Sequence, residues 1–195
     1  MMKMKHLTLG DYQTNCYILY DEASPNCVII DPGYEPRRVL EAVKALGKTV
    51  EAILLTHGHF DHVGGVKSIA EQTGCRVYIC REELKLPPYY TNGTLYYTHC
   101  YADGDVLQVA GLEVTVMHTP GHTPGSVCLM VEDTIFTGDT LFRGSCGRTD
   151  IGGDWEVLQA SLARFRTLEP NFWIQPGHGD MNALIDEWNY NPYLR

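Results

Sequence analysis

The chain has 195 residues, of which 44% are hydrophobic and 20% charged, and its formal net charge is −9. Residues 1–195 are therefore expected to form one soluble globular domain rather than a disordered chain, and no apolar run approaches the roughly 18 residues of a membrane span. The acidic charge argues against a nucleic-acid partner, and the N-terminus shows no signal-peptide pattern, so we expect a cytoplasmic protein.

The first half of the chain alternates predicted strands and helices. Short runs of branched and aromatic residues predict strands, and Asp31-Pro32-Gly33 predicts the turn that closes the first three. Apolar residues at helical spacing, followed by Gly47, predict the first helix. The expected strands are residues 7–9, 16–20, 27–30, 52–55 and 76–80, and the expected helices are residues 35–46 and 63–73.

Residues 83–104 interrupt this alternation, because they show little periodicity and contain Pro87-Pro88. They predict a long loop or short helical turns. Long loops in compact domains are often functional, so the tyrosines here are candidates for the wall of a substrate pocket. The alternative is a surface segment anchored to the core by its aromatic rings. The tyrosines are Tyr89, Tyr90, Tyr96 and Tyr97.

Strand signals return in the second half, which carries two further predicted helices. The first of these helices places Trp155, Leu158, Leu162 and Phe165 on one face. Strands interleaved with single helices indicate an α/β fold, and two β-rich halves fit a sandwich of two sheets flanked by helices. The expected strands are residues 106–109, 112–117, 127–131, 134–136 and 171–175, and the helices are residues 155–168 and 182–189.

Seven cysteines are present, an odd number, and none forms a Cys-x-x-Cys pair. Several lie inside apolar runs, which predicts buried free thiols in a reducing cytoplasm. Cys146 differs because it lies in a glycine-rich loop, and it is the candidate for a reactive thiol.

Residues 57–62 read His-Gly-His-Phe-Asp-His, directly after an apolar strand-like run and before Gly64-Gly65. Imidazole and carboxylate are ligands for zinc, iron and manganese. Burying four such groups together without a cation would be costly, because uncompensated polar groups are expensive to desolvate. The segment therefore predicts a metal site built from His57, His59, Asp61 and His62.

Three more candidates follow strand-like runs and stand next to a glycine: His122, Asp139 and His178. A turn after a strand is a rigid place to present a ligand, and glycine allows close approach of the backbone. Five of the eight histidines thus lie in turns of this kind, which favours metal binding over isolated structural roles. His118 is expected to support the site from outside, and His6 and His99 to be solvent or loop residues.

The motifs His57-x-His59-x-Asp61-His62, Pro-Gly-His122, Gly138-Asp139 and Gly177-His178 resemble, in order, those of the metallo-β-lactamase superfamily. The decapeptide starting at Thr56, the Gly147-Arg148-Thr149-Asp150 segment and the Asn191-Pro192-Tyr193-Leu194 ending resemble short bacterial members of its glyoxalase II (hydroxyacylglutathione hydrolase) branch, which lack the C-terminal helical domain.

The resemblance implies a four-layer αβ/βα sandwich of two mixed sheets, with a metal pair at one edge. It implies that one metal binds His57, His59 and His122, that the other binds Asp61, His62 and His178, and that Asp139 bridges them. Zinc is the first choice of metal, and iron or manganese share the same donor types. Asp61 and Asp139 would be the catalytic carboxylates.

The resemblance further implies hydrolysis of a small-molecule thioester, such as S-lactoylglutathione, by a hydroxide that bridges the metals. A thiolate is a good leaving group, since the pKa of a thiol is about 8.5. The alternatives are a lactonase or esterase of the same fold, a mononuclear iron persulfide dioxygenase, and a non-enzymatic binding module. Oligomeric state stays open.

Substrate recognition would fall to positive groups near the site, because only residues 179–195 follow His178. Arg143 and Arg148 are the candidates, together with Tyr89 and Tyr90 as aromatic walls. For Arg148 a structural pair with Asp150 is the alternative.

Overall fold

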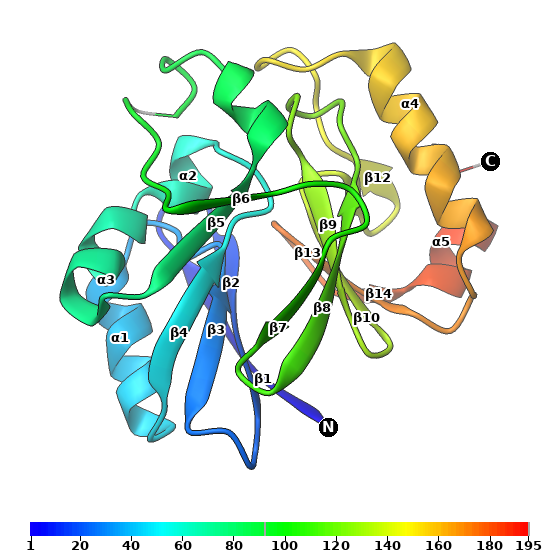
Figure 1. Cartoon of the computed structure of the whole chain (residues 1–195). Helices are drawn as coiled ribbons and strands as arrows, with labels where there is room; N and C mark the ends of the chain where they lie inside the picture. The colour runs from blue at the N-terminus through cyan, green and yellow to red at the C-terminus, as the bar shows by residue number, and fades with distance from the viewer. Residues whose placement is uncertain (92, 195) are drawn as a thin grey trace.

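The computed structural model describes residues 1–91 and 93–194, so Asn92, within the expected long loop, lies outside the described residues. Two six-stranded sheets face each other, and helices cover the outer face of each (Figure 1). Both sheets are mixed, so the predicted four-layer sandwich is confirmed. In the part of the chain described, no helix has the length and apolarity to cross a membrane.

The first sheet has the order β1-β2-β3-β4-β5-β6. β1 to β3 pair antiparallel and β3 to β6 pair parallel. The parallel strands β3 and β4 are buried on both faces, which explains their nearly continuous apolar runs. The strands are β1 (Met2–Leu9), β2 (Thr14–Asp21), β3 (Asn26–Ile30), β4 (Thr49–Leu54), β5 (Arg76–Cys80) and β6 (His99–Tyr101).

The second sheet has the order β14-β13-β10-β9-β8-β7. Only β10 and β13 pair parallel. A separate hairpin, β11 (Leu141–Phe142) and β12 (Ser145–Cys146), follows β10, and its first strand contacts β10 and β13. The strands of the sheet are β7 (Val106–Val109), β8 (Leu112–His118), β9 (Val127–Val131), β10 (Thr134–Gly138), β13 (Trp173–Pro176) and β14 (Asn182–Ala183).

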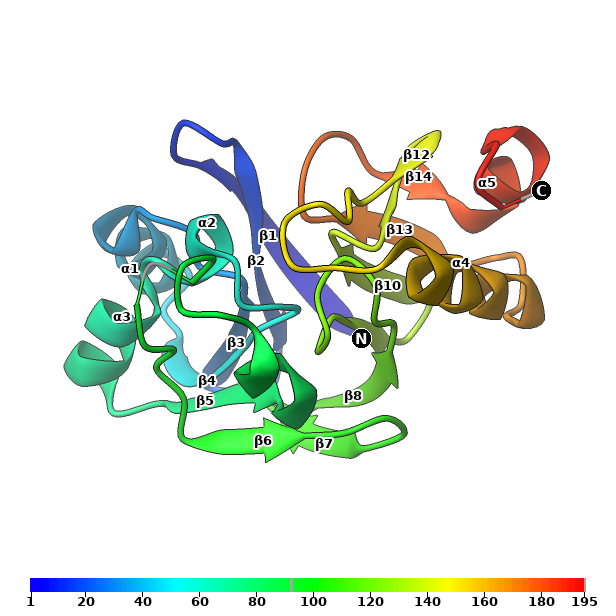
Figure 2. The same ribbon diagram turned by 90° about the horizontal axis from the view of Figure 1, so that it is seen from above.

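The helices lie on the outer faces (Figure 2). Those on the first sheet are α1 (Pro36–Ala45) and α3 (Val66–Thr73), and those on the second are α4 (Trp155–Arg164) and α5 (Leu184–Tyr190). Three apolar clusters result. Leu19, Leu54 and Phe136 belong to the one between the sheets, Ile69 to the one under α1 and α3, and Leu162 to the one under α4.

Four sequence expectations need correction. Residues 83–104 overlap the 3₁₀ helix η1 (Arg81–Lys85), which agrees with the expected short helical turns, but they also contain strand β6, which was not expected. The helix expected at residues 63–73 is divided into α2 (Phe60–Val63) and α3. Trp155 is 41% exposed and does not join the buried face of α4. Residues 182–189 begin as strand β14 before α5.

The candidate ligands lie where strands end. β3, β4, β8, β10 and β13 each end beside one of the segments singled out from the sequence. Carboxyl ends of parallel strands meet at one edge of a sheet, and in α/β proteins this edge is where sites form. The fold thereby gathers segments that are far apart in the sequence.

Candidate metal centre and its cavity

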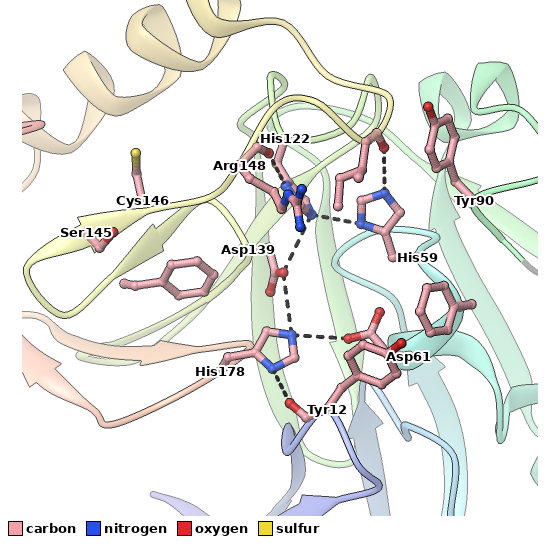
Figure 3. A pocket seen from close by; sticks show the side chains of 13 residues that line it. Tyr12, His59, Asp61, Tyr90, His122, Asp139, Ser145, Cys146, Arg148 and His178 are labelled. Atoms are coloured by element: carbon pink, nitrogen blue, oxygen red, sulfur yellow. Dashed lines mark hydrogen bonds and ion pairs between the residues drawn. The ribbon is translucent and has the colours of Figure 1, made fainter.

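Five histidines and two aspartates converge at this edge. Figure 3 shows His59, Asp61, His122, Asp139 and His178, with Asp139 between His122 and His178. His59 Nδ1 and His122 Nε2 lie 2.8 Å apart, and His62 Nε2 and His178 Nε2 lie 3.2 Å apart. Asp139 Oδ2 lies 3.6 Å from His122 Nε2 and 3.5 Å from His178 Nε2. The structure therefore brings together all seven side chains that the sequence singled out.

The outward ring nitrogen of three of these histidines faces a backbone carbonyl, which can only accept a hydrogen bond. That nitrogen must therefore carry the proton, and the inward nitrogen keeps a lone pair. The contacts are His59 Nε2 to the Ile151 oxygen at 3.0 Å, His122 Nδ1 to the Arg148 oxygen at 2.6 Å, and His178 Nδ1 to the Tyr12 oxygen at 3.0 Å.

The other two histidines are held in the same way through Asp31. His62 Nδ1 donates to Asp31 Oδ2 at 2.9 Å, and Thr56 donates to the same carboxylate through its N–H at 2.9 Å and its hydroxyl at 2.5 Å. Because the Thr56 hydroxyl proton is used there, its oxygen accepts from His57 Nδ1 at 3.0 Å. Asp31 thus acts as an acceptor that fixes both rings.

Five inward lone pairs therefore face one another and two carboxylates. His57 Nε2 and Asp139 Oδ1 are buried atoms with no hydrogen-bond partner. Neutral imidazoles whose lone pairs point together need a cation between them. Ligand atoms around a tetrahedral zinc lie about 3.3 Å apart, close to the separations seen here. The donor set fits divalent metal ions.

Burial keeps three of the five rings in their ligating form, whereas nearby carboxylates raise the pKa of His62 and His178 against the effect of burial. Burial lowers the pKa of His57 and His122, and lowers that of His59 to about 4, so these rings are neutral at pH 7. Burial opposes protonation of His62, but Asp139 and Asp31 raise its pKa. A cation bound beside it would replace that proton, so metal affinity should weaken as the pH falls.

The loop that carries His178 is fixed by the hairpin of β1 and β2. Asn15 Nδ2 donates to the carbonyls of Pro176 and Gly179 at 3.0 and 2.9 Å, and the Tyr17 hydroxyl donates to Pro176 at 2.7 Å. His6 is exposed, as expected, but it lies in β1 rather than in a loop, and its Nε2 bonds Asn15 Oδ1 at 2.8 Å. The N-terminal hairpin thereby orients the last histidine of the cluster.

Glu83 joins the two loops that carry His59 and His122. Its buried carboxylate accepts from the Gly58 N–H at 2.6 Å, the Gly125 N–H at 2.7 Å and the Thr123 hydroxyl at 2.8 Å. Burial raises the pKa of Glu83, and these three hydrogen bonds oppose that rise. A side chain at Gly125 would meet the Glu83 backbone nitrogen at 2.2 Å, so the contact requires glycine.

A cavity of about 550 Å³ opens over the cluster. Arg148 and Tyr90 line it, but Arg143 and Tyr89 do not. Arg143 pairs with Asp180 at 3.3 Å, and Tyr89 is 86% exposed. The remaining lining residues are Tyr12, His59, Phe60, Asp61, His122, Asp139, Phe142, Ser145, Cys146, Ile151 and His178.

Comparison with known proteins decides the family. The model of the metallo-β-lactamase superfamily matches residues 9–178, a span that contains all seven side chains of the cluster. The chain belongs to the metallo-β-lactamase superfamily. It is 31% identical to the hydroxyacylglutathione hydrolase GloC of Haemophilus influenzae, in an alignment that covers 99% of this chain and 98% of that protein.

Two solved structures share the metallo-β-lactamase fold closely. The B3 metallo-β-lactamase BLEG-1 aligns with a TM-score of 0.89 and 34% identity, over 100% of this chain and 99% of that one. TTHA1623, solved in a di-iron-bound form, aligns with a TM-score of 0.83 and 36% identity, over 97% of this chain and 100% of that one. The chain therefore has the fold and the His/Asp clusters of a metallo-hydrolase.

One wall of the cavity is held by the C-terminal segment. Glu187 is buried and accepts from the Gly144 N–H at 2.9 Å, while Asn191 Nδ2 donates to the carbonyls of Phe142 and Ser145 at 3.3 and 3.0 Å. These contacts hold the β11–β12 hairpin, which supplies Phe142, Ser145 and Cys146 to the cavity. The Asn-Pro-Tyr ending noted in the sequence thus supports the site.

Two further histidines have structural contacts. His118 Nε2 lies 3.0 Å from the Pro124 carbonyl, so His118 braces the turn that carries His122, as expected. His99 lies in strand β6 rather than in a loop, and stacks on Tyr78 with ring centroids 4.8 Å apart.

Sequence reasoning missed several residues that shape the metallo-β-lactamase site. Asp31 was visible only as part of a turn, although an aspartate after a buried strand was a usable signal. Glu83 carried no signal, because an Arg-Glu-Glu-Leu segment reads as exposed helix. Tyr12 and Phe60 enter the cavity wall only through the fold.

Cys146 is expected to react slowly with alkylating reagents. All seven cysteines are free, and burial raises the pKa of Cys146 to about 11, so the reactive thiolate is a minor form at pH 8. Its rate of labelling by iodoacetamide, followed by peptide mass mapping, should still rise tenfold per pH unit between pH 8 and 10. A rate that levels off above about pH 9.5 would show an unperturbed thiol instead.

Proposed function

We propose that the chain is a metal-dependent hydrolase that cleaves thioesters, with hydroxyacylglutathione thioesters such as S-lactoylglutathione as the first class to test. The observation that carries this proposal is the set of five inward-facing imidazole nitrogens and two carboxylates at the base of an open cavity. The likeness to the hydroxyacylglutathione hydrolase GloC supports the choice of substrate class.

Two cations are proposed, zinc first, with iron or manganese as alternatives. His57, His59 and His122 would hold one, and Asp61, His62 and His178 the other. Asp139 would bind both, since Oδ1 lies 3.4 Å from His62 Nε2 and Oδ2 lies 3.6 Å from His122 Nε2. When bound, a metal pair of this kind lowers the pKa of water and polarises a carbonyl.

The chain's own residues orient the reaction. Asp61 Oδ2 accepts from the Thr14 hydroxyl at 3.3 Å and lies 3.2 Å from His178 Nε2, which fixes the carboxylate at the cavity floor. From there Asp61 can accept a hydrogen bond from an attacking water and orient it. A thiol leaving group needs little help, because its pKa is only about 8.5. Thioesters therefore suit this site better than amides.

The direct test combines activity with metal content on one sample. We expect S-lactoylglutathione absorbance to fall in the presence of the protein, about two metal equivalents per chain, and loss of turnover with a chelator that is reversed by added zinc, manganese or iron. Turnover that survives complete metal removal would refute the proposal. One iron per chain, together with oxygen uptake when glutathione persulfide is added, would identify the protein as a dioxygenase instead of a hydrolase.

β-Lactam hydrolysis is the second candidate, since BLEG-1 shares 34% identity over the whole of this chain. The same metal-loaded sample tests it with the chromogenic β-lactam nitrocefin. If this activity dominates, kcat/KM for nitrocefin will exceed that for every thioester tried.

A further inference from the structure

The lining of the cavity above the metal centre exposes more apolar than polar surface, and Tyr12, Phe60, Tyr90 and Phe142 contribute aromatic rings to it. Tyr12 and Phe60 pack edge to face with centroids 5.1 Å apart. Tyr90 lies 6.2 Å from the His59 ring and Phe142 lies 6.3 Å from the His178 ring, each measured between centroids. Aromatic walls therefore stand directly beside candidate metal ligands, where the group attached to a scissile carbonyl would lie.

The same cavity offers no free positive side chain among the residues the structure describes. Arg148 is the one arginine or lysine in its lining, and its Nε and Nη2 donate to the two oxygens of Asp150 at 2.6 and 2.5 Å. Both residues are exposed, and the Arg148 guanidinium holds the pKa of Asp150 at about 2, so the pair is net neutral. Arg143 lies outside and pairs with Asp180.

Glutathione carries two carboxylates, and a carboxylate that leaves water needs a cation or several donors. An apolar group needs only apolar surface, and pockets of a few hundred cubic ångströms with aromatic lining suit small molecules of that kind. The apolar lining of the cavity therefore suits the acyl group of a thioester better than it suits a charged thiol such as glutathione.

We propose that the cavity selects thioesters by an aryl or branched aliphatic acyl group, and that the identity of the thiol carrier contributes little. This proposal rests on the proposed thioester hydrolysis. It assigns Phe142 and Tyr90 as residues that determine specificity, one from the β11–β12 hairpin and one from the loop after η1.

Four thioesters separate the two halves of the substrate: lactoyl and phenylacetyl groups, each on glutathione and on uncharged N-acetylcysteamine. We expect kcat/KM to be at least tenfold higher for phenylacetyl than for lactoyl on either thiol, and to differ less than threefold between the thiols. Equal or better use of the lactoyl group, or a gain of tenfold or more from glutathione, would overturn the proposal.

Two variants test which residues create the preference for the phenylacetyl group. Phe142→Ala and Tyr90→Ala should each reduce the phenylacetyl-to-lactoyl ratio by fivefold or more, through KM rather than kcat. Tyr190→Ala is the matched control, because Tyr190 is 72% exposed and outside the cavity, and its ratio should not change. An unchanged ratio in both cavity variants would contradict the assignment.

A binding measurement keeps this proposal separate from the proposed function. Thioether analogues of the phenylacetyl and lactoyl compounds cannot be hydrolysed, and calorimetry on the metal-loaded protein gives their dissociation constants. At least tenfold tighter binding of the phenyl analogue supports the cavity preference, and equal affinity overturns it. Failure to cleave any of the four thioesters overturns the hydrolase, whatever the analogues show.

Discussion

Replacing Asp139 by asparagine is expected to lower kcat/KM for thioester hydrolysis by about 10³-fold or more and to remove at least one metal equivalent. Asp139 faces both candidate metal positions: Oδ1 has no hydrogen-bond partner and lies 3.4 Å from His62 Nε2, and Oδ2 lies 3.6 Å from His122 Nε2 and 3.5 Å from His178 Nε2. The amide keeps the shape of the side chain but removes the charge and turns one acceptor into a donor. Metal analysis and steady-state kinetics on the same preparation test this.

The matched control is Asp186→Asn, which makes the same chemical change on the exposed face of α5. It should keep its metal and its turnover. Full activity and two metals in Asp139→Asn would show that this carboxylate does not bridge. A melting temperature measured on both metal-free variants separates loss of metal from loss of fold.

Replacing Glu83 by glutamine is expected to weaken metal binding by about 10- to 100-fold, although Glu83 is not placed to contact a metal. Its two oxygens accept three hydrogen bonds from the loops that carry His59 and His122. A glutamine amide must direct its NH₂ group at an N–H or hydroxyl donor, which leaves a buried donor unsatisfied. That defect should lower the free energy of unfolding by about 1–3 kcal/mol.

Glu82→Gln provides the comparison at the neighbouring position, where the side chain is 42% exposed and pairs with Lys85. Its metal affinity, measured by competition with a chromogenic chelator, should stay within threefold of the parent chain. The assignment fails if Glu83→Gln binds metal as tightly as Glu82→Gln. If Glu83→Gln raises the dissociation constant for metal but recovers the parent kcat at saturating metal, Glu83 positions the ligand loops and takes no direct part in the reaction.

The sequence could predict the sandwich and the metal cluster because both depend on local signals. Apolar runs such as those of β3 and β4 are long enough to identify strands, and each candidate ligand stands beside a strand end and a glycine. His57, Asp139 and His178 could therefore be grouped before their distances were known. Their convergence follows from parallel pairing, which brings strand ends to one edge.

The cavity wall could not be predicted in the same way, because it depends on which loops meet in space. Tyr89 and Tyr90 are adjacent in sequence, yet only Tyr90 faces the cavity. Arg143 looked like a substrate cation and instead lies beside Asp180. Glu83 is a buried carboxylate whose partners, Gly58 and Gly125, lie 25 and 42 residues away. No short window of sequence contains such a contact.

The hydrogen bonds between Asn15 and the loop that carries His178 join the two ends of the chain, so they can form only late in synthesis. Asn15 and Gly179 are 164 residues apart, and they meet only when β13 has joined β10 in the second sheet. The ribosome makes the N-terminal residues first, so His57, His59 and His62 emerge before His122, Asp139 and His178. A nascent chain that ends before residue 178 therefore lacks part of the candidate ligand set, so we expect metal to bind only after β13 and the loop that follows it have been made.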